Sequence, residues 1–406
     1  MRIVLAGFGT RGDVQPMVAL AQALSDRGHS CSVFVPPNIA EWVTSFGLDT
    51  TPVGMDYEKL SHAVSTGRLL DVLGALPDLR AEVARQGEAI EAAASQADVI
   101  VGASVLAGGS SLADRFGIPY VFFAFSPSLI PSREHPSPAV TKIDTPRWMN
   151  PLLWVVNEWI WRWLLRSPIN RQRRAWKLAP IREFWPALLG ERTVIATEPT
   201  LAPLAPPLRP MPRLVQTGAI FLPEASDVSA ETERFLASGS PPVFIGFGSM
   251  GDRNPRRTAE RLLEAVRLAG VRALVSRGWA GLHLERAPER VLFIGPEPHG
   301  KLFPRVAAVM HHGGSGTTHV AMKSGVPQIV MPHLLDQYYW AYHVRRIGIG
   351  LELRERFSLD ARAIAGAFRR CVDDGALREA ARRQAGMTRL DGLDRAVEIV
   401  ESAAQS

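Results

Sequence analysis

The sequence has very little cysteine and no long apolar run. Cys31 and Cys371 are the only cysteines among 406 residues, which excludes a disulfide framework and any cysteine-rich metal module. No stretch of about 18 apolar residues is free of charge, so no segment is predicted to span a membrane. The first residues, MRIVLAGFG, are too short for a secretory signal and predict a buried strand that runs into a glycine turn. We therefore expect a reduced, soluble, cytoplasmic protein.

The chain also has little excess of one charge over the other. Lysine and arginine total 46 against 40 acidic residues, a net charge of +6, and hydrophobic residues make up 46% of the chain. These values exclude a disordered or collagen-like chain. The small positive excess, with no accompanying nucleic-acid module, argues against nucleic acid as a partner. At roughly 100–200 residues per domain, the length predicts two domains.

Proline is concentrated at one place near the middle of the chain. Six prolines fall within residues 199–214, PTLAPLAPPLRPMPRL. Because proline fixes φ and lacks an N–H donor, neither a helix nor a central strand is expected there, and we predict a semi-rigid linker. The predicted domains are residues 1–214, ending in that linker, and residues 215–388. A C-terminal helix within residues 389–406 could pack back on the first domain.

Short apolar runs alternate with helical patterns in both halves, which predicts two α/β domains, each a doubly wound parallel sheet. In the first half the predicted strands are Ile3–Ala6, Cys31–Val35, Val99–Val101, Tyr120–Phe125 and Val194–Ala196. In the second half they are Val243–Gly246, Ala273–Val275, Val291–Ile294, Ala307–Met310, Gln328–Met331 and Gly350–Leu353. Ligands bind at the carboxyl ends of such strands, so a cleft between the domains should hold two substrates.

The first glycine motif, GFGTRG at residues 7–12, follows a predicted strand and matches a dinucleotide fingerprint. That fingerprint expects an acid at the end of the second strand, where this chain has VFVPPN at residues 33–38. We therefore favour a longer motif, GTRGDVQP, in which Asp13 sits at a loop tip and Pro16 lies in the first turn of a helix. From spacing alone, Asp13 is either a helix cap or a general base.

The second glycine motif, HHGGSGTTH at residues 311–319, follows the strand at Ala307–Met310 and enters a helix. Glycines allow close approach, and open N–H groups at a helix start favour phosphate. No Gly-Lys-Ser/Thr follows, so this is not a P-loop. A metal site built from the histidines and a purely structural turn are the weaker alternatives. Downstream, Asp336 and Gln337 follow another strand end and could bind sugar hydroxyls, or Asp336 could only cap a helix.

Together these motifs resemble inverting glycosyltransferases with the GT-B fold, which consists of two facing Rossmann-like domains with an inter-domain cleft. The similarity is greatest to vancomycin-type natural-product enzymes and to sterol glucosyltransferases, and it spans nearly the whole chain. GFGSM at 246–250, SRGW at 276–279 and PHGKLF at 298–303 also fall where that family has its donor loops. The resemblance implies a UDP- or dTDP-linked sugar as donor and a hydrophobic hydroxylated molecule as acceptor.

The resemblance also implies a role for each motif residue. Asp13 matches the catalytic base, and Thr10 and Arg11 lie near the donor phosphates or the acceptor. Asp336 and Gln337 match the pair that binds sugar hydroxyls. The resemblance implies further donor-site residues: Ser249 near the phosphates, Ser276 in a donor loop, and Trp279 and the Pro296–His299 loop beside the nucleotide base. It also implies that His312, Gly314, Ser315, Gly316 and Thr317 bind the diphosphate.

The implied reaction is a single displacement without a metal or other cofactor. Consistent with that, the chain contains no D-x-D triplet. Two departures from plant relatives are visible. Those enzymes use a histidine at the position of Asp13, backed by a separate aspartate, whereas residues 102–104 here read Gly-Ala-Ser. They also have a ribose-binding acid shortly after the phosphate motif, where this chain reads His319-Val320-Ala321, so UDP and dTDP both stay open.

Two other functions stay open: a nucleotide-sugar epimerase or hydrolase on the same fold, and a non-catalytic auxiliary binding protein. One further segment is unusual, because seven of the ten tryptophans fall between Trp148 and Trp185, interleaved with arginines. Three interpretations are open for this segment. Its tryptophans could pack in a core, line the acceptor pocket, or form a basic aromatic surface that makes peripheral contact with an anionic membrane.

Overall fold

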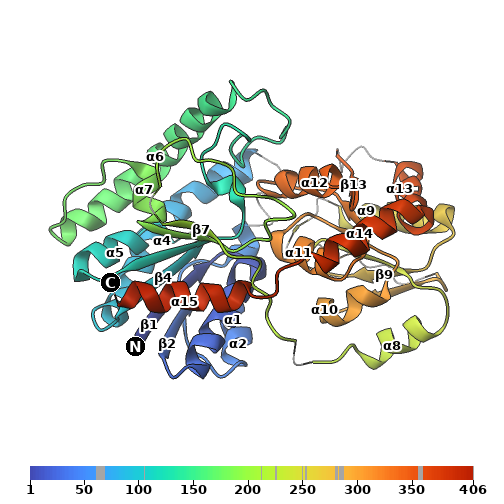
Figure 1. Cartoon of the computed structure of the whole chain (residues 1–406), viewed down its shortest axis with the longest axis horizontal. Coiled ribbons are helices and arrows are strands. Elements are labelled where there is room, and N and C mark those ends of the chain that lie inside the picture. The colour runs from blue at the N-terminus through green and yellow to red at the C-terminus, as the bar shows by residue number, and fades with distance from the viewer. Residues whose placement is uncertain are drawn as a thin grey trace.

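The computed structural model describes residues 1–60, 69–104, 106–211, 213–224, 226–248, 250–251, 254–278, 282, 288–354 and 360–405. Two predicted donor-site residues, Ser249 and Trp279, lie outside the described residues. The chain forms two α/β domains side by side, as the sequence predicted (Figure 1). No helix among the described residues is long and apolar enough to cross a membrane.

The first domain is built on a seven-stranded parallel sheet with the order β3-β2-β1-β4-β5-β6-β7. Its strands are β1 (Arg2–Phe8), β2 (Ser30–Val35), β3 (Asp49–Pro52), β4 (Val99–Ser104), β5 (Tyr120–Ala124), β6 (Arg192–Ile195) and β7 (Leu214–Gln216). Its helices are α1 (Arg11–Asp26), α2 (Pro37–Thr44), α4 (Leu69–Ala94), α5 (Gly109–Phe116), α6 (Asn150–Ala175) and α7 (Phe184–Leu189), with a 3-10 turn at Pro127–Leu129.

The second domain is built on a six-stranded parallel sheet with the order β10-β9-β8-β11-β12-β13. Its strands are β8 (Val243–Gly246), β9 (Ala273–Ser276), β10 (Val291–Ile294), β11 (Ala308–His311), β12 (Gln328–Val330) and β13 (Gly350–Glu352). Its helices are α8 (Ala230–Ala237), α9 (Pro255–Ala269), α10 (His299–Leu302), α11 (Ser315–Lys323), α12 (Gln337–Arg346), α13 (Ala361–Asp373) and α14 (Gly375–Gly386), with a 3-10 turn at Phe303–Arg305.

Strand β1 shows why the sheets are buried on both faces. Successive side chains of a strand point to opposite sides, so Ile3 and Leu5 join the apolar cluster beneath α1, whereas Val4 and Phe8 join the cluster that includes residues of α4 and α5. All four are almost fully buried. A parallel strand covered on both faces needs a continuous apolar run, which is what IVLAGF supplies.

The chain changes domain at a different place from the predicted linker. Beyond the proline-rich stretch, β7 pairs in parallel with β6 at the edge of the first sheet, with Ile195 opposite Gln216. The prolines therefore lead back to the first sheet, because extended, donor-poor backbone is tolerated beside a sheet edge. The first domain continues to Gln216, two residues beyond the predicted boundary at 214.

The C-terminal helix α15 (Gly392–Ala404) belongs to the first domain. Its buried residues Ala396, Val397 and Val400 share the apolar cluster of α1, and Figure 1 shows α15 beside α1 with both chain termini in that domain. Arg395 also donates to the Thr217 carbonyl at 3.1 Å. The two domains are thus joined by two crossings, one after β7 and one before α15.

Candidate active site

The carboxyl edges of the two sheets face each other across the domain junction. Helix α1 of the first domain is in contact with α11 of the second. The described residues of the predicted site all follow strand ends at these edges: Thr10, Arg11 and Asp13 after β1, Ser276 at the end of β9, Pro296 and His299 after β10, His312 to Thr317 after β11, and Asp336 and Gln337 after β12. The fold therefore gathers one group from the first domain and four groups from the second.

The turn between β1 and α1 differs from the predicted loop. Helix α1 begins at Arg11 with Thr10 as its N-cap, so Asp13 is the third residue of the helix and not a loop tip. Pro16 correspondingly lies inside the helix rather than in its first turn. Gly9 has φ of 149°, and a Cβ atom there would lie 2.3 Å from Asp13 Oδ2. Only glycine fits this position, and its small size leaves room for the carboxylate.

Three donors hold the Asp13 carboxylate. The Thr10 amide donates to Oδ2 at 2.8 Å and the Thr10 hydroxyl to the same atom at 3.2 Å. The Ser104 hydroxyl donates to Oδ1 at 2.7 Å. Asp13 keeps some surface exposure, yet burial among surrounding atoms raises its pKa, and these hydrogen bonds oppose that rise only in part. A carboxylate with a raised pKa is a stronger base than an ordinary one.

Ser104 is the residue that sequence reasoning missed. It ends β4 with φ of 55° and lies opposite Phe8 in the β1–β4 pairing. The resemblance directed attention to residues 102–104 as the place of an activating carboxylate, but a serine was not considered as a partner. Parallel pairing of β1 with β4 was the available signal, because it places the end of β4 next to the Gly9 turn.

The second glycine motif leaves a helix start open. Gly314 is the N-cap of α11, no side chain caps the helix, and its first turn has no acidic residue. Gly316 is exposed, and Ser315 and Thr317 are half-buried. The amide groups at a helix start have no partner within the helix and carry partial positive charge. This end of α11 can therefore accept an anion, and the phosphate site predicted for the motif stays a prediction.

His312 lies between two glycine loops beside that helix start. A Cβ atom on Gly314 would be 2.5 Å from His312 Nε2, and one on Gly248 would be 3.1 Å from Cε1. Burial, with smaller contributions from His311 and His299, lowers the pKa of His312 to about 3. Its Nδ1 atom is buried without a hydrogen-bond partner. A neutral imidazole with an unused nitrogen can bind a polar group of a ligand.

The three histidines of the motif do not converge on a metal site. His311 Nε2 lies 2.9 Å from Gln328 Oε1, and its Nδ1 accepts the Gly313 amide at 3.1 Å. His319 Nε2 accepts the Glu198 amide from the domain junction at 3.0 Å. Within the described part of the chain, no group of three or more His, Cys, Asp or Glu side chains could hold a metal ion.

Asp336 and Gln337 lie at the start of α12 but differ in their surroundings. Asp336 occupies the N-cap position without capping, and its Oδ2 accepts the Trp340 indole N–H at 3.1 Å. Burial raises the pKa of Asp336 to about 7, and the charge of Asp13 across the cleft adds to the rise. Gln337 Oε1 accepts the amides of His333 and Leu334 at 2.8 and 3.0 Å. Its amide is thus bonded within the protein, whereas the prediction had it facing sugar.

The remaining site residues form the rim of the cleft. His299 stacks on Phe303 with ring centroids 4.5 Å apart, and Pro296 is exposed nearby. Burial lowers the pKa of His299 to about 4, and the charge of Arg11 from the other domain lowers it further. The Arg11 guanidinium lies 4.5 Å from the centre of the Trp42 ring. Trp42 was not predicted to be near the site, because its position in α2 gives no sequence signal for contact with Arg11.

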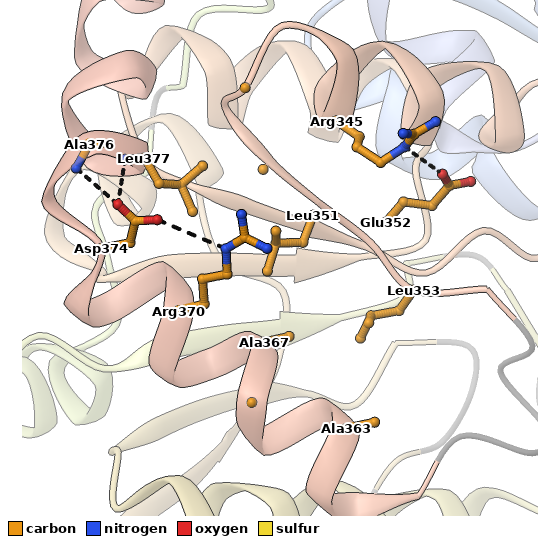
Figure 2. Close-up of a pocket in the computed structure, with 13 residues that line it drawn as sticks. Arg345, Leu351, Glu352, Leu353, Ala363, Ala367, Arg370, Asp374, Ala376 and Leu377 are labelled. Carbon is orange, nitrogen blue, oxygen red and sulfur yellow. Dashed lines mark hydrogen bonds and ion pairs between the residues drawn. The ribbon is translucent and has the colours of Figure 1, made fainter.

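A separate surface pocket lies away from this cleft. It has a volume of about 590 Å³ and lies between β13 and helix α13 (Figure 2). Arg345 and Glu352 form an ion pair at 3.1 Å on its wall, and Arg370 faces Asp374 at 3.9 Å. None of the predicted site residues lines it. The predicted site residues that the structure describes thus lie apart from this pocket, at the junction between the domains.

Comparison with known families agrees with this division into two domains. Residues 3–130 match the glycosyltransferase family 28 N-terminal domain. Residues 275–390 match the C-terminal domain described as erythromycin biosynthesis protein CIII-like. The two matches cover the Asp13 turn and the second glycine motif respectively.

The curated relatives are glycosyltransferases. The chain is 36% identical over 356 residues to glycosyltransferase GtfE of Amycolatopsis orientalis, covering 86% of this chain and 85% of that protein. It is also 36% identical over 355 residues to the vancomycin aglycone glucosyltransferase of that organism, with the same coverage. A sterol 3-beta-glucosyltransferase of Arabidopsis thaliana is 30% identical over 377 residues, covering 86% of this chain and 59% of that protein.

Solved structures agree with the fold. The kitacinnamycin glycosyltransferase superposes with a TM-score of 0.72 at 18% identity, covering 99% of this chain and 98% of that one. Glycosyltransferase VinC, solved with dTDP, gives 0.68 at 19% identity over the whole of both chains. Since these sequence relatives are at least 30% identical over most of the chain, the protein belongs to the GT-B glycosyltransferase family that includes the vancomycin-type and sterol glucosyltransferases.

Proposed function

We propose that the protein transfers a hexose from a UDP- or dTDP-linked sugar to a hydroxyl group of a hydrophobic natural product or sterol-like molecule, with inversion at the anomeric carbon. The single observation that carries the proposal is the position of Asp13. Its carboxylate is held by Thr10 and Ser104 at the cleft, where the second domain places the open start of α11 and the carboxyl group of Asp336.

In the proposed reaction Asp13 is the general base. It accepts the proton of the acceptor hydroxyl while the acceptor oxygen forms a bond to the anomeric carbon of the donor. The bond between that carbon and the β-phosphate oxygen breaks, and the nucleoside diphosphate leaves with the electron pair. General bases of this kind contribute roughly 10²–10⁴-fold to rate, and a pKa nearer to working pH makes the transfer more favourable.

The second domain would bind the leaving group. The amides at the start of α11, with the Ser315 and Thr317 hydroxyls, can bind the diphosphate, and His312 can donate a hydrogen bond while neutral. Asp336 is placed to accept hydrogen bonds from sugar hydroxyls. The names of relatives that act on the vancomycin aglycone and on sterols support a natural-product or sterol-like acceptor. Arg11 and the Pro296–His299 loop would contact the donor at the rim.

The reaction product distinguishes the proposed transferase from the alternative functions. We expect the purified chain, given UDP- or dTDP-hexoses and an aglycone or sterol acceptor, to form a glycoside whose anomeric configuration, read by NMR coupling constants, is inverted from the donor. Asp26→Asn, at the far end of α1, is the matched control and should react like wild type. A glycoside with retained configuration would contradict the proposal. Free hexose alone would identify a hydrolase, and donor binding without any product would identify an auxiliary binding protein.

A further inference from the structure

Helix α6 lies on the outer side of the first domain (Figure 1). A row of apolar side chains along it is exposed. Trp148, just before the helix, and Trp159 are each 67% exposed, and Trp163 is 55% exposed. The row also includes Leu152, Val155, Val156 and Ile160. Because these positions recur at three- and four-residue spacing, they form one continuous face, which we call the α6 stripe.

The opposite face of α6 accounts for the tryptophans that pack inside the protein. Trp154 is 2% exposed, donates its indole N–H to the His135 carbonyl at 3.1 Å and meets Trp185 edge to face. Leu164 and Ile169 are also buried on this face. The interpretation of the segment as core packing is therefore right for Trp154 and Trp185 but wrong for the three tryptophans of the stripe.

The charged residues of this region are mostly basic. Residues 147–177 contain seven basic residues and one acidic residue, a net +6 that equals the net charge of the whole chain. The exposed Arg166 and Arg174 follow Trp163 by three and eleven residues, which keeps them on the face of the stripe. The Arg80 guanidinium also lies 4.5 Å from the centre of the Trp163 ring. The stripe thus passes from apolar and aromatic to basic along one helix face.

We propose that the α6 stripe binds the surface of an anionic membrane, with its tryptophans at the headgroup level and its arginines against lipid phosphates. Tryptophan favours that boundary, and a helix with an apolar face and basic flanks lies flat in it. A small-molecule pocket is a poorer fit, because such pockets bury most of their ligand, whereas Trp148 and Trp159 are each 67% exposed. A second copy of the chain would bring two arginine-rich faces together, and their repulsion opposes pairing.

The test uses the full chain without donor or acceptor, so its result does not depend on the proposed transfer reaction. Co-sedimentation is measured with vesicles of phosphatidylcholine containing about one-third phosphatidylglycerol, and with vesicles of phosphatidylcholine alone. We expect binding to the anionic vesicles that weakens as salt is raised, and much weaker binding to the neutral ones.

Two variant pairs separate the apolar and the basic contributions. Trp148→Gln with Trp159→Gln should lower partitioning by at least about tenfold, because two exposed indoles lose their apolar contact. Arg166→Glu with Arg174→Glu should lower binding to anionic vesicles by at least about tenfold and leave the weak neutral binding unchanged. The matched controls are Leu390→Gln, at a leucine that is 68% exposed outside the helix, and Arg383→Glu on α14, and both should bind like wild type.

Circular dichroism and the melting temperature verify that each variant is folded, which is expected because every substituted side chain is exposed. The proposal is overturned if wild type stays in the supernatant with anionic vesicles, or if both variant pairs bind as wild type does. It is also overturned if wild type self-associates in the absence of lipid and the tryptophan pair abolishes that association, since the stripe would then join two copies.

Discussion

The two domains build the same strand, glycine turn and helix, but they complete the helix start in opposite ways. In the first domain the start of α1 contains its own anion, because Asp13 accepts the amide and hydroxyl of Thr10. In the second domain the start of α11 has no acidic residue and no capping side chain. The start of α1 is thus occupied by a carboxylate of the same helix, whereas the amide groups at the start of α11 are open.

This difference separates two chemical tasks. A helix start attracts negative charge, so it can either orient an internal carboxylate or bind an external phosphate. At α1 the internal carboxylate excludes a second anion by repulsion, and in the proposed reaction it accepts the proton of the acceptor hydroxyl. At α11 the open amides suit a diphosphate. The four predictions below test this separation, beginning with the largest expected effect.

Gly9→Ala should damage the occupied helix start most. The new Cβ atom would lie 2.3 Å from Asp13 Oδ2, at φ of 149°, so the carboxylate must move. We expect kcat to fall by about 10²–10³-fold while the Kd of the nucleoside diphosphate is unchanged. Steady-state kinetics and calorimetry measure the two quantities.

The control is Gly28→Ala, just after α1. Gly28 also has positive φ, 84°, but a Cβ atom there meets nothing within 4 Å. This variant should lose stability through backbone strain and keep its kcat. If both glycine variants turn over equally, the position of Asp13 does not limit the reaction.

Asp336→Asn should change how stability depends on pH. The pKa of Asp336 is about 7 in the folded protein, raised by burial, and about 3.9 when unfolded. Because the folded pKa is raised, the stabilising contribution of the protonated group is complete below about pH 4 and is lost as pH rises to about 7. Relative to the Asn variant, wild type should therefore lose on the order of 3 kcal/mol over that range. Thermal midpoints at a series of pH values measure it, and a constant difference would refute the raised pKa.

Ser104→Ala should shift the acid limb of the pH–rate profile. The serine hydroxyl donates to the Asp13 carboxylate at 2.7 Å and opposes the rise in its pKa. Without that donor the pKa rises further, so the acid limb of kcat/KM should move up by about one pH unit. Ser32→Ala is the matched control, because it removes a serine hydrogen bond to Asp49 at 3.0 Å, away from the site. An unshifted limb would mean that Asp13 is not the group that titrates.

Ser315→Ala should have the smallest effect of the four. It removes one hydroxyl from the open start of α11, so nucleoside diphosphate should bind about two- to tenfold more weakly, with kcat nearly unchanged. Ser324→Ala, at the other end of the same helix, is the control and should bind normally. Equal affinity in both variants would place the diphosphate elsewhere.

Sequence patterns predicted the buried strands and missed only the two edge strands of the first sheet. Every predicted strand corresponds to a strand of the structure, and most of these strands are continuous apolar runs. The two missed strands, β3 and β7, are the edges of the first sheet, and neither has a buried residue in its pattern. An edge strand is defined by pairing with its neighbour, which hydrophobic periodicity does not report.

The motif positions were predictable because each follows a buried strand, but the contacts between them were not. Asp13 was found from its glycine motif, whereas Ser104, whose hydroxyl donates to Asp13, lies 91 positions farther along the chain. The pairing of β1 with β4 makes that contact, and only the three-dimensional register reveals it. Likewise, the inward amide of Gln337 depends on the turn at His333 and Leu334, which its sequence position does not indicate.

The most direct test of the division between the two helix starts is Asp13→Asn, because asparagine keeps the size of the side chain and loses the base. The rate of a single turnover and the Kd of UDP or dTDP are measured on the same sample, beside Asp26→Asn. We predict a loss of rate of at least about 10³-fold, with the Kd within about twofold of wild type. A rate within about tenfold of wild type, or a Kd that weakens in parallel with the rate, would contradict the assignment of Asp13 as the base.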